Sequence, residues 1–153
     1  MKFLYVYPEK CTGCRQCSLA CGLKKFGVSN PKFGAINVVR DEFERYEFQF
    51  VCQQCEDPEC VTACSKNALT KEENGIVKWH EDKCIGCRMC IAACPCGGIS
   101  SLKGKIIKCD LCDGDPTCVK FCSTKAVVYE EETQEAINRR KQMAQVLRHN
   151  KSE

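Results

Sequence analysis

The stretch CTGCRQCSLAC at residues 11–21 carries four cysteines with the spacing C-x2-C-x2-C-x3-C, and this spacing organises the whole sequence. It returns in CIGCRMCIAAC at residues 84–94, where Pro95 follows directly. Two further quartets are CQQCEDPECVTAC at residues 52–64 and CDLCDGDPTCVKFC at residues 109–122. We number these groups one to four in chain order. They contain sixteen of the 17 cysteines, and Cys96 stands outside them.

The four groups alternate between two kinds of motif. Groups one and three superpose at an offset of 73 residues. Groups two and four superpose at an offset of 57, which becomes 58 after one inserted residue. Internal repeats of this kind point to a structural unit that is used more than once. The A-B-A-B order therefore predicts a chain made of two copies of one two-motif module.

The spacing within the groups is typical of cubane iron–sulfur clusters. A C-x2-C-x2-C loop bends around one cluster and presents three thiolates to three irons. Gly13 and Gly86 supply the unhindered backbone that such a turn needs close to sulfur. The fourth cysteine is expected on the helix that leaves the loop, where it faces the cluster of a partner motif. Structural zinc, usually held by two separated C-x2-C knuckles, and disulfides are the alternatives.

Composition supports a fold that depends on its cysteines. Cysteine makes up about 11% of the 153 residues, above the usual range for globular chains. Without cysteine, only about a third of the chain is apolar, which is little for a conventional core. If four clusters carry about −2 each with their thiolates, the loaded chain has a charge of about −5 instead of the formal +3. The formal charge therefore gives no reason to expect a nucleic-acid partner.

No targeting or membrane segment is recognisable in the sequence. The longest uncharged apolar run near the N-terminus is Phe3–Tyr7, shorter than the core of a signal peptide. No stretch approaches the length of a membrane-spanning helix. We therefore expect a cytoplasmic protein with metal-binding cysteines and no membrane span.

The segments between the groups predict short elements. Residues 2–7 and 76–79 are expected as strands that enter groups one and three, because they are rich in aromatic and β-branched residues. Residues 35–39 and 46–51 predict a β-hairpin, with Glu47 and Gln49 on its polar face. Residues 69–70 and 127–129 predict strand pieces, residues 100–105 a polar crossing, and residues 131–147 a helix.

Several runs together resemble one known family. They are PEKCTGCRQCSLAC at 8–21, CQQCEDPECVTAC at 52–64, KCIGCRMCIAACP at 83–95 and KCDLC at 108–112. They are similar to the small polyferredoxin subunits that carry electrons for molybdenum and tungsten oxidoreductases, formate dehydrogenases, hydrogenases and carbon monoxide dehydrogenases. The short N-terminus and the Asn30-Pro31 turn look closest to the iron–sulfur subunits of tungsten-dependent aldehyde oxidoreductase complexes.

This resemblance, which covers residues 1 to about 130, implies the fold and the ligands. The fold class is α+β: two ferredoxin-like halves, a duplicated two-[4Fe-4S] module, with an inserted β-hairpin and a C-terminal helix. In the family, group one pairs with group four and group two with group three. The implied ligands of four [4Fe-4S] clusters are Cys11, Cys14, Cys17 and Cys122; Cys21, Cys109, Cys112 and Cys118; Cys52, Cys55, Cys60 and Cys94; and Cys64, Cys84, Cys87 and Cys90.

The same resemblance implies the domain organisation. Residues 1–130 would form one polyferredoxin unit, in which the module of groups 11–21 and 109–122 is intertwined with the module of groups 52–64 and 84–94. Residues 131–153 would form a helical tail. The chain departs from the family pattern where a proline would follow each remote cysteine: only Cys94 has one, and Gly22, Ser65 and Ser123 stand at the other places.

The expected function is electron transfer within an oxidoreductase complex of anaerobic metabolism. The sequence contains no P-loop, no G-x-G-x-x-G motif and no recognisable nucleophile–base pair, so we expect no catalytic role. The resemblance implies a large tungsten- or molybdenum-pterin catalytic subunit, of the aldehyde oxidoreductase type, at one end. A flavin subunit, a soluble ferredoxin or a further copy of the chain would be the second partner.

Three alternatives remain open at this point. The complex could be a related one, built around a formate dehydrogenase, hydrogenase, carbon monoxide dehydrogenase or aromatic acyl-CoA reductase. The chain could be a free soluble polyferredoxin, or a zinc-knuckle interaction protein. In the tail, Ile137, Met143, Ala144 and Leu147 form an apolar stripe that we expect at an interface. Cys96 is expected to be a small buried side chain.

Overall fold

Eight short strands pair two by two into four antiparallel sheets in the described part of the chain, residues 2–43 and 46–151 of the computed structural model. The pairs are β1 (Lys2–Val6) with β8 (Val127–Glu131), β2 (Ile36–Asp41) with β3 (Tyr46–Val51), β4 (Leu69–Lys71) with β5 (Val77–Trp79), and β6 (Ile99–Leu102) with β7 (Lys105–Lys108). The helices in these residues are α1 (Gln16–Phe26), α2 (Glu59–Thr62), α3 (Met89–Ala93), α4 (Thr117–Phe121) and α5 (Gln134–Lys151). None of them is long and apolar enough to cross a membrane.

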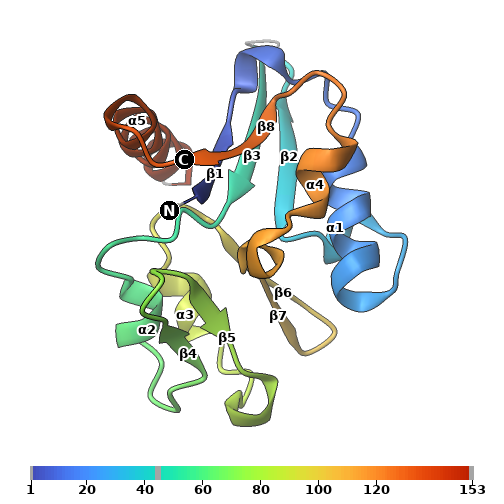
Figure 1. Cartoon of the computed structure of the whole chain (residues 1–153). Helices are drawn as coiled ribbons and strands as arrows, with labels where there is room; N and C mark the ends of the chain where they lie inside the picture. The colour runs from blue at the N-terminus through green and yellow to red at the C-terminus, as the bar shows by residue number, and fades with distance from the viewer. Residues whose placement is uncertain (1, 44–45, 152–153) are drawn as a thin grey trace.

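The elements form two lobes (Figure 1). The first lobe contains β1, β8, the β2–β3 hairpin, α1 and α4, and its core includes Leu4, Tyr5, Ile36 and Val127. The second lobe contains α2, α3 and the β4–β5 pair. The buried residues of its hydrophobic core cluster are Cys60, Leu69, Val77, Cys90, Cys94, Cys96, Ile99 and Ile106. Half of that core is cysteine, so the second lobe is organised largely around its thiols.

The two lobes contain strand pairs with the same register. Val6 on β1 lies opposite Val127 on β8, and Trp79 on β5 lies opposite Leu69 on β4. The offset of 73 residues relates Val6 to Trp79, and the offset of 58 residues relates Leu69 to Val127. These are the same offsets that superpose the cysteine groups. Because β1 and β8 come from the two ends of the domain, this pair closes the first lobe, whereas β4 and β5 are neighbours in sequence.

The prediction of a polar crossing at residues 100–105 was wrong. Residues 99–108 form the β6–β7 hairpin, whose two-residue turn, Lys103-Gly104, has positive φ angles of 50° and 76°. Such angles are those of the I′ turns that suit β-hairpins. Ile106 packs in the second-lobe core and Ile107 in the first-lobe core, because successive strand residues face opposite sides. The hairpin therefore lies between the lobes.

The predicted tail helix is present as α5, which begins at Gln134 and lies beside β1 (Figure 1). Ala136 packs against the first-lobe core and Ala144 against the second-lobe core. The guanidinium of Arg139 stacks 4.1 Å from the ring centroid of Tyr7 and contacts the Glu9 carboxylate at 3.3 Å. The predicted stripe also contains Ile137, Met143 and Leu147. Of these three, the side chains of Met143 and Leu147 lie outside the described part of the structure. Part of the stripe thus packs on the protein itself.

Candidate iron–sulfur cluster sites

Four cysteines from opposite ends of the domain line one pocket in the first lobe. Cys11, Cys14 and Cys17 come from the loop that leads into α1, and Cys122 comes from the end of α4. Gln49 of β3 lines the same pocket. Burial, first of all, raises the pKa of the Cys17 thiol to about 11, and the nearby thiols of Cys11 and Cys122 add to this. Groups one and four therefore meet here.

A second pocket, in the second lobe, has the same composition. Cys84, Cys87 and Cys90 come from the loop that leads into α3, and Cys64 lies just after α2. Trp79 of β5 lines this pocket as Gln49 lines the first. Within the described residues, no three His, Cys, Asp or Glu side chains converge closely enough to bind one metal ion. The quartets instead surround shared pockets.

The remaining eight cysteines of the quartets also gather across groups. Burial and the neighbouring thiols of Cys109, Cys21 and Cys112 raise the pKa of the Cys118 thiol. Burial and the thiols of Cys52, Cys94 and Cys55 raise the pKa of the Cys60 thiol to about 11, while Lys108 opposes the shift. Each set combines three cysteines of one group with the fourth cysteine of another.

The fourth cysteines do not all lie on helices, in contrast to the prediction from spacing. Cys21 lies within α1, but Cys94 and Cys122 are the residues that end α3 and α4, and Cys64 follows α2 by two residues. For the two C-x2-C-x2-C groups, the prediction of an outgoing helix is therefore right for Cys21, whereas Cys94 is the residue at which α3 ends.

Backbone N–H groups point at the first cysteine of three groups. The N–H of Gly13 donates to Cys11 Sγ at 3.4 Å, that of Gln54 to Cys52 Sγ at 3.5 Å, and that of Leu111 to Cys109 Sγ at 3.5 Å. All three donors have positive φ angles, of 72°, 47° and 58°, which turn the N–H back toward the sulfur two residues earlier. Such bonds stabilise a charged thiolate and offset the negative charge of a bound cluster.

The remote cysteines Cys64 and Cys122 have a different environment from the buried thiols. Burial raises the pKa of Cys64, but backbone N–H groups, above all that of Ala68, outweigh burial and lower the pKa. Burial also raises the pKa of Cys122, but hydrogen bonds from the backbone N–H of Val127 and the Thr124 hydroxyl outweigh burial and lower that pKa. These two thiols are therefore prepared for the deprotonated state that metal ligation needs.

The residues present fit a [4Fe-4S] cluster. Each of the two pockets contains four thiols and one buried side-chain N–H group that has no hydrogen-bond partner among the described residues: Nε2 of Gln49 and Nε1 of Trp79. Buried polar groups of this kind normally have partners, so each needs an explanation. The inorganic sulfide and thiolate sulfurs of a cluster are acceptors for such N–H groups.

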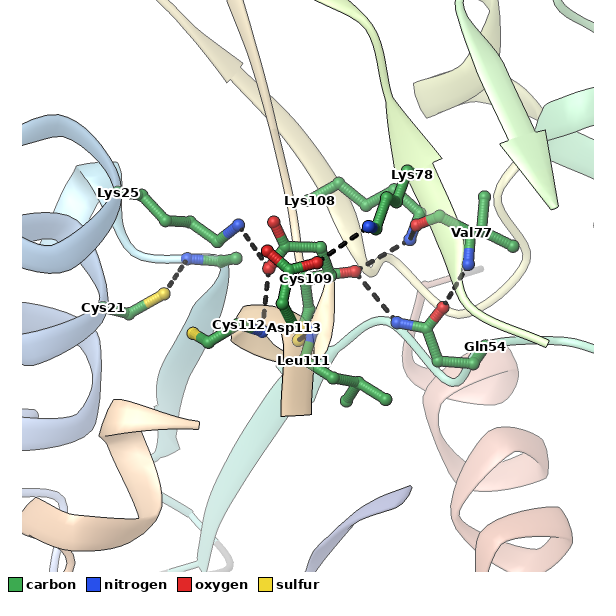
Figure 2. Close-up of polar contacts among 12 residues, drawn as sticks. Cys21, Lys25, Gln54, Val77, Lys78, Lys108, Cys109, Leu111, Cys112 and Asp113 are labelled. Atoms are coloured by element: carbon green, nitrogen blue, oxygen red, sulfur yellow. Dashed lines mark hydrogen bonds and ion pairs between the residues drawn. The ribbon is translucent and has the colours of Figure 1, made fainter. Parts of the chain in front are cut away.

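Sequence reasoning missed three residues at these sites. The polar face predicted for β3 turns inward, because Gln49 is 0% exposed and reaches the cysteine pocket. Gln54 and Lys108 are buried between the lobes, in the polar network of Figure 2. Alternation along β3 identified the face of Gln49, but not the fact that this face covers a pocket. The position of Lys108 directly before Cys109 was the only available signal.

A further ion pair holds the loop of group four. The Lys25 amine of α1 contacts the Asp110 carboxylate at 2.7 Å, and Asp110 accepts a hydrogen bond from the N–H of Cys112 at 3.0 Å. Burial raises the pKa of Asp110, but the Lys25 amine outweighs burial and holds that pKa below its usual value. The pair thus links α1, which carries Cys21, to the loop that carries Cys109 and Cys112.

These pockets and their thiols define an iron–sulfur protein. A family model for the 4Fe-4S dicluster domain matches residues 43–132, and the chain belongs to this family. The match contains groups two, three and four, and group one lies before it.

Known proteins are similar over most of the chain. The polyferredoxin-like subunit of the aliphatic sulfonate oxidoreductase of Pyrococcus furiosus is 40% identical over 124 residues, 78% of this chain and 70% of that protein. The B subunit of the anaerobic dimethyl sulfoxide reductase of Escherichia coli is 34% identical over 143 residues, 80% of this chain and 70% of that protein. A solved chain of the active site complex BamBC of benzoyl coenzyme A reductase, with benzoyl-CoA, matches with a TM-score of 0.48 and 23% identity, over 100% of this chain and 98% of that one.

The expected function is confirmed at this level. The chain is an iron–sulfur electron-transfer subunit of the kind found in oxidoreductase complexes, and it is not a catalytic subunit.

Proposed function

We propose that the chain is a four-cluster electron wire joining a tungsten- or molybdenum-pterin catalytic subunit, of the aldehyde oxidoreductase type, to a second redox partner. The observation that carries this proposal is the pair of cysteine pockets in different lobes. Each has one exposed cysteine, Cys14 in the first and Cys87 in the second. Both ends are therefore within reach of a partner, as a wire requires.

The proposed ligand sets follow the thiols that lie together. Cys11, Cys14, Cys17 and Cys122 would hold the cluster at one end, and Cys64, Cys84, Cys87 and Cys90 the cluster at the other. Two inner clusters would use Cys21, Cys109, Cys112 and Cys118, and Cys52, Cys55, Cys60 and Cys94. When bound, each cluster takes up and releases one electron. The thiols position the clusters, and the buried N–H groups favour the reduced, more negative state.

The order of the wire is supported by the electrostatic effect of one set of thiols on another. The thiol of Cys17 contributes to the raised pKa of Cys118, which joins the outer and inner sets of the first lobe. The thiol of Cys52 does the same for Cys109, which joins the two inner sets across the lobes. The equal strand registers support the proposal that the lobes are two copies of one module.

The partners are proposed on the same basis. The sulfonate oxidoreductase and dimethyl sulfoxide reductase relatives are named as subunits of oxidoreductases, which supports a large catalytic partner. We assign the helical tail, α5, to an interface with a partner subunit. We propose the cytoplasm as the compartment, because thiols that bind metal must stay reduced before the clusters are inserted. The second partner would be a flavin subunit, a soluble ferredoxin or another copy.

Metal analysis tests the cluster number directly. Anaerobically prepared chain should contain about sixteen iron and about sixteen acid-labile sulfide. About twelve iron would show that one quartet is empty, and zinc without sulfide would refute the proposal. Purification of the native complex and identification of its largest subunit tests the partner class. A chain that elutes alone from native cells would instead be a free polyferredoxin.

Deletion of residues 131–153 tests the role of α5. The shortened chain should keep its cluster spectrum and lose affinity for the catalytic subunit. A matched control is Arg139→Ala, which removes the contacts with Tyr7 and Glu9 but leaves the helix in place. If the deletion still forms the full complex, the interface assignment fails.

A further inference from the structure

Lys108 is a buried cation at the junction between the lobes. Its residue is 5% exposed, and its Nζ donates to the carbonyl oxygen of Val77 at 2.6 Å and to that of Cys109 at 2.8 Å. Val77 belongs to the second-lobe pair and Cys109 to the first-lobe core. Within the described residues, the amine contacts these two neutral carbonyls and no carboxylate. Burial of a charge without a counter-ion is costly, which calls for a functional explanation.

Gln54 holds the amine in place. Its Nε2 donates to the same Cys109 carbonyl at 2.9 Å, and its Oε1 accepts from the N–H of Val77 at 2.9 Å (Figure 2). The peptide groups of Val77 are thus engaged on both sides, its N–H by Gln54 and its C=O by Lys108. These hydrogen bonds join residues that are separated in sequence by 23, 31 and 55 positions. Together they leave the amine little freedom to move.

Other lysines near the junction are neutralised. Lys25 pairs with Asp110 at 2.7 Å, and Lys78 pairs with Asp113 at 2.7 Å and with Glu72 at 3.3 Å. Figure 2 shows Lys25 at the left of the network and the ion pair of Lys78 with Asp113 next to Lys108. The net positive charge at the centre of the junction therefore comes from Lys108.

Lys108 lies beside residues of both inner ligand sets. It directly precedes Cys109, whose carbonyl oxygen its Nζ contacts at 2.8 Å. Gln54, which donates to the same carbonyl oxygen, belongs to group two, and its backbone N–H donates to Cys52 Sγ at 3.5 Å. A positive charge in a low-dielectric interior interacts strongly with nearby negative charge, and a cluster becomes more negative by one unit when it is reduced.

We propose that Lys108 sets the reduction potentials of the two inner clusters, raising both, and so controls the electron's crossing between the lobes. The proposal rests on the four-cluster function above. In the crossing, one electron leaves the reduced cluster of one lobe and enters the oxidised cluster of the other. No bond forms or breaks and no proton moves. Lys108 does not ligate iron; it is a positioning residue that acts through its charge.

A potentiometric titration followed by EPR spectroscopy tests this on the holoprotein. Lys108→Met keeps most of the side-chain length and removes the charge. The equilibrium constant for reduction should fall about tenfold at both inner clusters, which is 59 mV for one electron. The outer clusters should keep their potentials. The inner signals are assigned from the variants Cys112→Ser and Cys55→Ser, each of which perturbs one inner cluster.

Three variants separate charge from packing. Lys105→Met removes a cation from the same strand whose amine pairs with Glu81 at 2.9 Å, and it should shift neither inner potential. Lys108→Arg keeps the charge and should restore both. Gln54→Met removes the hydrogen bond to Cys109 without a change of charge, and should shift the potentials less than Lys108→Met. Equal shifts for Gln54→Met and Lys108→Met would overturn the proposal.

Iron analysis of each variant accompanies the titration. If Lys108→Met contains fewer than about sixteen iron, Lys108→Gln, which can still donate to one carbonyl, replaces it in the same titration. Unchanged inner potentials in a fully loaded neutral variant refute the role of Lys108 alone. A wild-type chain without four clusters refutes the proposed wire, whatever the variants do.

Discussion

The two outer pockets use the same cysteine pattern and differ in what surrounds it. The first is covered by the β2–β3 hairpin, which places Gln49 against the cysteines and Glu47 close to Gly13. The second lacks such a cover and is lined by Trp79. At the positions equivalent to Thr12 and Gln16, the second pocket has Ile85 and Met89, which are 64% and 55% exposed.

This difference shows that two pockets with the same cysteine pattern can have different surroundings. Ligation depends on the cysteines and the loop backbone, and these are the same in both lobes. The surroundings decide which surface a partner meets: the β2–β3 hairpin and the exposed side chain of Phe121 at one end, and the exposed side chains of Ile85 and Met89 at the other. Exposed apolar side chains that lie together mark interaction surfaces.

Removal of the clusters should have the largest effect, and it should be greater in the second lobe. Among the described residues, four of the eight buried core residues there are cysteines, against five of the eighteen in the first lobe. We therefore expect cluster ligation to supply more of the folding free energy in the second lobe than in the first. Amide hydrogen exchange after treatment with acid and chelator should show loss of protection in both lobes, complete in β4 and β5. Equal residual protection in the two lobes would contradict the comparison.

Loss of a single remote ligand should perturb one cluster only. Cys21→Ser is expected to disturb the cluster of Cys109, Cys112 and Cys118 and to spare that of Cys11, Cys14 and Cys17. Cys94→Ser, the equivalent change in the other lobe, should disturb the cluster of Cys52, Cys55 and Cys60. EPR spectra and iron counts distinguish the cases. A structure with Cys21 and Cys11 on one cluster would refute the assignment.

Substitution of two glycines that lie against neighbouring backbone should have a smaller effect than loss of a ligand. The two glycines lie in different parts of the molecule. A Cβ at Gly98 would lie 2.6 Å from Cys52 Cα, and a Cβ at Gly34 would lie 2.6 Å from the Ser18 carbonyl oxygen. Gly98→Ala and Gly34→Ala should each destabilise the holoprotein by about 1–3 kcal/mol, because backbone must move. Thermal unfolding measures the loss. Gly98→Ala should also release iron first from the cluster of Cys52, and iron released equally from all sites would argue against local strain.

The smallest effect is expected from the two buried N–H donors. If a cluster occupies each pocket, Gln49→Leu and Trp79→Phe should each remove one hydrogen bond to it, worth about 1 kcal/mol. The reduction potential of the outer cluster beside the changed residue should fall by about 40 mV, since 1.4 kcal/mol corresponds to 59 mV for one electron. Each variant serves as the control for the other, because each should leave the outer cluster of the other lobe unchanged. A shift in the potential of that distant cluster would mean that the change acts through the fold.

The local parts of this protein could be predicted from the sequence. The C-x2-C loops, the hairpin at residues 35–51, the strands that enter groups one and three and the tail helix all depend on patterns within about ten residues. Glycine at position 13 was expected to allow a turn next to sulfur, and the structure has a φ of 72° there. Iron–sulfur electron transfer followed from the same spacing, because three thiolates within seven residues suit a cubane cluster.

The tertiary structure decided which distant groups share a surface. Spacing alone cannot bring Cys122 to Cys11; the pairing of β1 with β8 and the packing of α1 on α4 do so. The residues around the sites depend on the same packing. Gln49 is polar and was expected outside, yet the hairpin folds over a cysteine pocket and turns it inward. Lys108 is buried because the lobes close over β7, and a buried charge is stable only where carbonyls from both lobes converge on it.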